Sequence, residues 1–166
     1  MNDHSTKKAR GEALWFRAEK REEQGELRAA FRLMLAAAKL GNGSAQINVG
    51  NYYDDGRGVR RNRAAALYWF KRAYRRGDSC AAHNIGVVWR NERRFQRAVY
   101  WFSRAVELGD PESNLDIAKH FLHNENDAAK AIRYLKRVRP KGWVSEAGLE
   151  EAAALLRQAE RQLRRS

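Results

Sequence analysis

AQINVGNYYDDGRGV at residues 45–59 and AAALYWFKRA at residues 64–73 are the two stretches of this 166-residue chain that decide its fold. The first recurs in part as AAHNIG at residues 81–86, and the second recurs as VYWFSRA at residues 99–105. A looser copy of the second is FRLMLAA at residues 31–37. Because similarity at a regular spacing of a few tens of residues is typical of repeat proteins, we predict tandem structural units.

Both kinds of stretch have the spacing of a helix. In the second stretch, small and aromatic residues fall at i, i+3, i+4 and i+7, which places them on one stripe of an α-helix. These residues are Ala66, Trp69, Phe70 and Ala73. The same spacing returns at residues 98–105 and 131–138, and alternation of period two is missing. We therefore expect an all-α protein.

Glycine followed by Asn or Asp marks the boundaries between units. Gly41, Gly77 and Gly109 suit the left-handed residue that ends a helix. Asn or Asp after each glycine suits the start of the next helix, and Pro111 fits a first helical position. We predict helices near residues 12–23, 26–40, 44–55, 63–76, 79–91, 95–108, 111–123, 126–138 and 145–163.

The predicted helices divide the chain into three parts. Residues 1–10 are expected to be a disordered tail, residues 11–143 four antiparallel helix pairs, and residues 144–166 a capping helix with a basic tail. Gly50 and Gly86 lie inside predicted helices, where glycine costs about 1 kcal/mol relative to alanine. We expect this cost to be offset by a close approach of the two helices of a pair.

Residues 45–59 and 64–73 resemble the two halves of a Sel-1-like repeat, a relative of the tetratricopeptide repeat. The loop Gly56-Arg57-Gly58-Val59 separates the two families. The next unit lacks this loop, is four residues shorter, and resembles a tetratricopeptide unit. The resemblance implies a right-handed α-solenoid of antiparallel helix pairs with a C-terminal capping helix. It also implies an adaptor or scaffold that binds its partner in a concave groove lined by the first helix of each pair.

The repeat pattern assigns residues to this groove. They are Ile47, Asn48, Asn51, Asp54, His83, Asn84, Val87, Arg90, Asp116 and Lys119. Asn48 and Asn84 are the strongest candidates, because an amide side chain can donate to and accept from a peptide backbone at once. An equally good interpretation is that both asparagines bond to neighbouring helices.

The chain is strongly basic, with a formal net charge of +13 and a pI near 10.4. Such a charge attracts nucleic acid, an anionic membrane or an acidic protein. A basic surface is expected on the second helices and turns, at Arg60, Arg61, Arg63, Arg72, Arg75, Arg76, Arg93, Arg94 and Arg97. We expect an acidic protein partner ahead of a merely solvated surface, and nucleic acid third. Single-strand binding needs exposed aromatic rings, and the aromatic residues here fall at core positions.

No residue pattern predicts an enzyme, a cofactor or a metal site. Cys80 is the single cysteine, so neither a disulfide within the chain nor a multi-cysteine zinc site can form, and we expect it at a helix-pair interface. His120 and His123 with Asp116 could form only a weak metal site, and a polar helix face is the preferred interpretation.

The N-terminus lacks the apolar stretch of a secretory signal peptide, and no apolar run is long enough to cross a bilayer, so we expect cytoplasmic residence. The sequence favours a non-enzymatic protein-binding adaptor, with an immunity- or antitoxin-like inhibitor as a special case. The alternative is a nucleic-acid-associated protein that uses the basic convex surface.

Overall fold

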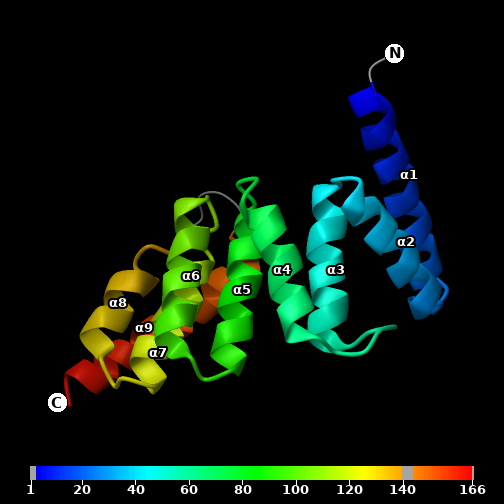
Figure 1. Ribbon diagram of the computed structural model, residues 1–166. Helices are drawn as coiled ribbons and strands as arrows, with labels where there is room; N and C mark the ends of the chain where they lie inside the picture. The colour runs from blue at the N-terminus through cyan, green and yellow to red at the C-terminus, as the bar shows by residue number, and fades with distance from the viewer. Residues whose placement is uncertain (1–2, 140–143, 166) are drawn as a thin grey trace. The chain divides into compact units, whose positions relative to one another are not determined.

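A computed structural model describes residues 3–139 and 144–165 of the chain. These residues form nine α-helices and no strand, which confirms the all-α prediction (Figure 1). The helices are α1 (Asp3–Glu23), α2 (Leu27–Lys39), α3 (Gly43–Asp55), α4 (Arg63–Tyr74), α5 (Ser79–Asn91), α6 (Phe95–Glu107), α7 (Ser113–His123), α8 (Ala128–Leu135) and α9 (Glu146–Leu163). Among them, none is both long and apolar enough to span a membrane.

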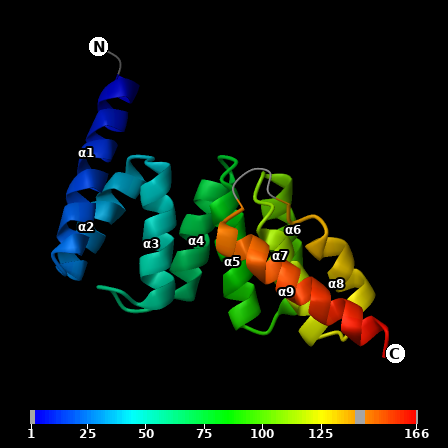
Figure 2. The same cartoon turned by 180° about the vertical axis from the view of Figure 1, so that it is seen from behind.

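The chain divides between Gly77 and Asp78 into two compact units. In the first unit, α1 packs on α2, α2 on α3, and α3 on α4. In the second unit, α5 packs on α6, α6 on α7, and α7 on α8. Helix α9 packs on α8 and also contacts α7, and Figure 2 shows it running along one side of this unit. Consecutive helices thus form the predicted pairs, and α9 closes the second unit as the predicted cap.

Most helix boundaries follow the predicted chemistry. Gly41, Gly77 and Gly109 have φ values of 93°, 85° and 97°, in the left-handed region. Asn42 and Asp78 are the N-caps of α3 and α5, and each side chain accepts a hydrogen bond from the backbone N–H three residues on. The Gly–Asn and Gly–Asp pairs therefore end one helix and begin the next.

The start of α7 differs from the prediction. The helix begins at Ser113, so Pro111 lies in a turn before the helix instead of at its first position. The carboxylate of Asp110 accepts from the backbone N–H of Glu112 and from the hydroxyl of Ser113. The amide of Leu115 bonds to the carbonyl of Glu112, three residues back. The backbone N–H groups of Glu112 and Leu115 are thus bonded within a tight turn, and the α-helix begins two residues after Pro111.

The N-terminal segment also differs from the expected disordered tail. Helix α1 already begins at Asp3, and residues 1–2 lie outside the described part of the chain. No proline or glycine interrupts residues 3–10, so nothing in the sequence ends the helix there. From Gly11 onward α1 packs against the end of α2, where a Cβ on Gly11 would lie 3.5 Å from the Cβ of Leu40. The side chains of residues 5–10 are exposed.

The two interior glycines have the predicted packing role. A Cβ added to Gly50 would lie 2.3 Å from Cε1 of Phe70, and one added to Gly86 would lie 2.6 Å from Cε1 of Phe102. Both phenylalanine rings are almost fully buried. Each ring therefore occupies the space that a side chain on the facing helix would need. The burial of one such ring contributes about 1.5–3 kcal/mol.

Candidate functional site

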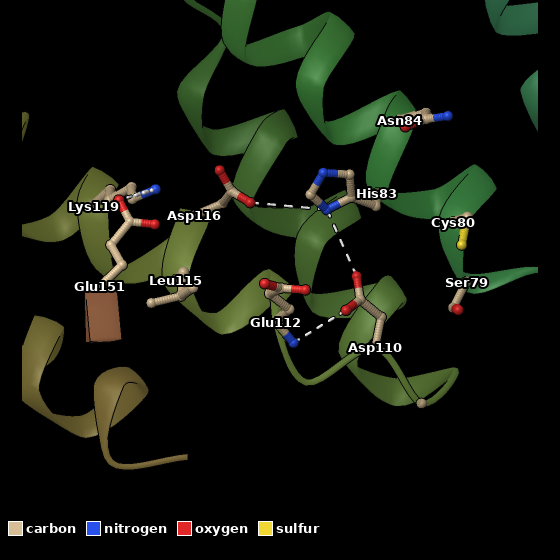
Figure 3. A pocket seen from close by; sticks show the side chains of 11 residues that line it. Ser79, Cys80, His83, Asn84, Asp110, Glu112, Leu115, Asp116, Lys119 and Glu151 are labelled. Carbon is tan, nitrogen blue, oxygen red and sulfur yellow. Dashed lines mark hydrogen bonds and ion pairs between the residues drawn. The ribbon is translucent and has the colours of Figure 1, made fainter. Parts of the chain in front are cut away.

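A pocket of about 650 Å³ lies between α5 and α7, which are the first helices of the two pairs in the second unit (Figure 3). We call it the α5–α7 pocket. Helix α5 contributes one wall, the turn before α7 and α7 itself contribute the other, and α9 adds one side chain. The lining residues are Ser79, Cys80, His83, Asn84, Gly109, Asp110, Glu112, Leu115, Asp116, Lys119 and Glu151.

His83 is held in this pocket by groups from the facing wall. Its Nδ1 lies 2.9 Å from Oγ of Ser113, 3.6 Å from Oδ2 of Asp110 and 3.8 Å from Oδ2 of Asp116. The Ser113 hydroxyl donates to Asp110 at 2.6 Å, so its oxygen is left to accept from the N–H of the His83 ring. The imidazole therefore connects α5 to Asp110 in the turn before α7 and to Ser113 and Asp116 in α7.

This Ser–His–Asp arrangement cannot act as a hydrolytic triad. A triad serine is exposed to substrate and gives its proton to histidine. Ser113 is fully buried, and its proton is donated to Asp110 instead. The cluster orients His83 structurally and supplies no nucleophile.

Carboxylates dominate the lining of the α5–α7 pocket. Asp116 forms an ion pair with Arg90, Glu151 pairs with Lys119 at 2.8 Å, and Glu112 accepts from the hydroxyl of Ser145 at 2.6 Å. The fourth carboxylate is that of Asp110, and Lys119 is the single lysine or arginine in the lining. The pocket therefore favours a cationic or hydrogen-bond-donating group, and it does not suit the acidic partner that the overall charge suggested.

Cys80 was expected at a helix-pair interface, and this prediction is wrong. Its side chain is exposed and lines the α5–α7 pocket, whereas the next two residues, Ala81 and Ala82, face the core. Partial desolvation and the carboxylates of Asp78 and Asp110 raise the pKa of the Cys80 thiol. Because the thiolate is the reactive form, this environment makes Cys80 a poor nucleophile at neutral pH.

The first unit has a related pocket of about 510 Å³ between α1 and α3, which we call the α1–α3 pocket. Its lining consists of Glu19, Glu22, Glu23, Asn48, Asn51, Tyr52 and Arg57. The Tyr52 hydroxyl donates to Glu22 at 2.9 Å, and Arg57 pairs with the other oxygen of that carboxylate at 2.6 Å. Burial and the neighbouring Glu22 raise the pKa of Tyr52. This pocket is acidic as well.

The structure brings part of the predicted groove together at these pockets. Asn48 and Asn51 line the α1–α3 pocket, while His83, Asn84, Asp116 and Lys119 line the α5–α7 pocket. The remaining predicted residues, Ile47, Asp54, Val87 and Arg90, line neither pocket. Asp54 lies 3.9 Å from Arg61, and Arg90 pairs with Asp116, so these two charges stabilise the units themselves.

Sequence reasoning missed most of the residues that make the pockets acidic. Glu112 and Asp110 belong to a turn that the repeat pattern treats only as a helix boundary. Glu151 lies on α9, outside the repeats, so no repeat position could assign it to the pocket. The acids of α1 gave a further indication, because Glu19, Glu22 and Glu23 follow one another within two turns.

The predicted basic surface is divided between the two units. Arg60, Arg61, Arg75, Arg76, Arg93, Arg94 and Arg97 are exposed, whereas Arg63 and Arg72 are half-buried. The expectation that the aromatic rings are buried is wrong at three positions, because Phe16 is 63% exposed, Tyr68 is 54% exposed and Tyr100 is 58% exposed. Each tyrosine lies outside the helical stripe formed by its neighbouring tryptophan and phenylalanine, so it faces solvent.

No group of three or more His, Cys, Asp or Glu side chains converges as a metal site among the residues that the structure describes. Nε2 of His120 lies 2.9 Å from Glu125, and its ring stacks on Phe95. These contacts give the histidine a structural role at the end of α7.

Comparison with known proteins identifies the repeats. The sequence profile of the Sel1 repeat matches residues 24–42, 43–78 and 91–110. The chain carries Sel1 repeats. The match at residues 43–78 covers the whole α3–α4 pair, and the other two cover α2 and α6, which are second helices of their pairs. No curated protein sequence matches this chain.

Solved structures support the same assignment. A Sel1 repeat protein from Oxalobacter formigenes is 25% identical, with a TM-score of 0.61 over 79% of this chain and 53% of that protein. The protective antigen c5321 of uropathogenic Escherichia coli, described as having an SLR fold, is 20% identical, with a TM-score of 0.69 over 92% of this chain. The chain spans about half of the first structure and 38% of the second. The expected all-α repeat fold is confirmed, and proteins built from Sel1 repeats are generally non-enzymatic protein-interaction scaffolds.

Proposed function

We propose that this Sel1 repeat protein is a non-enzymatic scaffold that binds a peptide segment of a partner protein in the α5–α7 pocket. The observation that carries the proposal is a pocket of about 650 Å³ whose walls are formed by side chains of α5, α7 and α9. Its polar groups can bind a peptide, and its serine–histidine cluster has no means of attacking one.

The chemistry of the lining defines the segment. Asn84 on one wall offers an amide that can bond a peptide backbone in both directions. The carboxylates of Asp110, Glu112 and Glu151 favour a lysine or arginine side chain in the segment. An acidic partner fits the exposed arginines of the basic surface and would be repelled by this pocket.

A phage-displayed library of random peptides, selected on the purified protein, tests the proposal. We expect the enriched peptides to carry lysine or arginine and to lose binding to Asn84→Ala and Glu151→Gln variants. Gln96→Ala is the matched control, because Gln96 is an exposed polar residue on α6 and does not line the pocket. Enriched peptides that are acidic, or that bind all three variants equally, would contradict the proposal.

A further inference from the structure

We propose that the exposed face of α4 binds single-stranded nucleic acid, with a base stacked on Tyr68 and phosphates held by Lys71, Arg72 and Arg75. These four residues lie on one side of the helix, at i, i+3, i+4 and i+7. The surface is in the first unit and shares no residue with the α5–α7 pocket, so this inference is independent of the peptide-binding proposal.

The ring of Tyr68 is presented to solvent in a fixed position. Its edge-to-face contact with Trp69 has a centroid distance of 5.2 Å and an interplanar angle of 84°. Trp69 is itself buried, so it gives the tyrosine a rigid support. The Arg72 guanidinium donates to the Tyr68 hydroxyl at 3.3 Å and lies 5.7 Å from the centroid of the Trp69 ring. An exposed aromatic face and a cation are thereby held next to each other.

The segment around Tyr68 carries many positively charged side chains and no negatively charged ones. Residues 56–77 contain no Asp or Glu. They contain Arg57, Arg60, Arg61, Arg63, Lys71, Arg72, Arg75 and Arg76. Of these, Arg57 and Arg61 form ion pairs with acids from other segments, namely Glu22 and Asp54. The charges on the Tyr68 side of α4 lie within a surface that a polyanion would be attracted to.

Helix α6 of the second unit carries a tyrosine at the position that corresponds to Tyr68, with less positive charge next to it. Tyr100 is exposed and makes an edge-to-face contact with Trp101 at 5.5 Å and 86°. However, the positions that correspond to Lys71 and Arg75 are Ser103 and Glu107, and Arg104 forms an ion pair with Glu107. The positive charge next to Tyr100 is therefore lower than that next to Tyr68. Helix α6 is therefore a control within the same protein, because it has an exposed tyrosine ring with less positive charge beside it.

The exposed ring favours nucleic acid over an acidic protein as the occupant. Arginine and lysine side chains alone would attract an acidic protein surface, and a half-exposed tyrosine ring would add little. A nucleobase has an apolar π-face that stacks on such a ring while the cations hold the phosphates. A duplex hides these faces within its own base stack, so the occupant must be single-stranded.

Fluorescence anisotropy with a labelled oligouridylate tests this inference. Tyr68→Ala is expected to weaken binding about tenfold, in line with the measured value of one base–aromatic stack. Tyr68→Phe retains the ring and is expected to bind nearly as the wild type does. Tyr100→Ala is the matched control and is expected to change the affinity less than twofold. Lys71→Gln and Arg75→Gln are each expected to reduce the salt dependence, by about 0.7 in the slope of log K against log salt.

Two further probes identify the class of occupant. Double-stranded RNA of the same length is expected to bind more weakly than the oligouridylate and to be insensitive to Tyr68→Ala. Polyglutamate is expected to be insensitive to the same substitution. Any of three results would overturn the inference. They are equal affinity for the duplex and the oligouridylate, a loss of polyglutamate binding in Tyr68→Ala as large as the loss of oligouridylate binding, and no binding of oligouridylate at low salt. Thermal melting of every variant, followed by circular dichroism, confirms that the fold is retained.

Discussion

The α3–α4 pair and the α5–α6 pair have the same core and different connections. In both pairs, an interior glycine on the first helix receives a phenylalanine ring from the second, as Gly50 does with Phe70 and Gly86 with Phe102. The connection between α3 and α4 is the long loop that contains Gly56 and Gly58, whereas α5 and α6 are joined by a short turn at Arg93. The contact between the phenylalanine ring and the glycine is therefore common to both pairs. The loop that connects the two helices of a pair can vary in length.

The two connections also differ in what they contact. Gly58 has a φ of 63° and lies so close to the start of α2 that an added Cβ would be 2.5 Å from the carbonyl oxygen of Leu27. The long loop thus packs on a neighbouring pair. The short turn is closed locally, because the amide of Arg94 bonds to the carbonyl of Trp89 and that of Arg93 to the carbonyl of Arg90. Four predictions test this comparison.

Gly58→Ala should have the largest effect. The substitution places a Cβ against backbone atoms of Leu27 and requires a left-handed conformation, so we expect the free energy of unfolding to fall by about 2–4 kcal/mol. Gly77→Ala is the matched control, since Gly77 has a φ of 85° but nothing within 4 Å of an added Cβ. Urea denaturation followed by circular dichroism measures both. Equal losses for the two variants would show that the contact with α2 contributes nothing.

Gly50→Ala and Gly86→Ala should each lower the free energy of unfolding by about 2 kcal/mol, because the added methyl group overlaps a buried phenylalanine ring. The two losses should be similar if the pairs share one core. Combining Gly86→Ala with Phe102→Leu should recover part of the loss, with a coupling energy of about 1 kcal/mol in a double-mutant cycle. Strictly additive losses would mean that the glycine and the ring do not interact.

Periodicity and boundary chemistry predicted most of the fold, for reasons that these contacts explain. The stripe of Trp69 and Phe70 and the caps at Asn42 and Asp78 are local patterns, and local patterns are visible in sequence. The pockets depend on residues that come from different segments, as Glu151 of α9 shows. The exposure of Tyr68 was missed because all aromatic residues were assigned to the core, although its helical position already places it outside the buried stripe.

Tyr52→Phe should affect the first unit alone, because the position that corresponds to Tyr52 in α5 is Val88, which has no hydroxyl. The variant loses the hydrogen bond to Glu22, and we expect a loss of about 1 kcal/mol at neutral pH. Because folding raises the pKa of Tyr52, its protonated form stabilises the native state below the ordinary tyrosine pKa of about 10. Above that pH the stabilisation is progressively lost.

The measurement is the difference in unfolding free energy between wild type and Tyr52→Phe as a function of pH. Groups that titrate in both proteins cancel in this difference. It should be constant near neutrality and shrink as the pH rises above about 10. A difference that grows in alkaline solution would have the wrong sign and would reject the hydrogen bond between Tyr52 and Glu22.

Arg93→Gly should have the smallest effect, and it should be stabilising. Arg93 has a φ of 57°, and the corresponding turns between α1 and α2 and between α7 and α8 place Gly25 and Asn126 in the same left-handed region. Removing the left-handed penalty gains about 1–2 kcal/mol, and the greater freedom of glycine in the unfolded chain offsets about 0.4–1 kcal/mol of that gain. We expect a net increase of about 0.5–1 kcal/mol in the free energy of unfolding. Arg94→Ala controls for the lost charge, because the φ of Arg94 is −89° and the substitution relieves no strain. If both variants gained the same stability, repulsion among the arginines would explain the effect, and the left-handed turn would not be the weak point of the shorter connection.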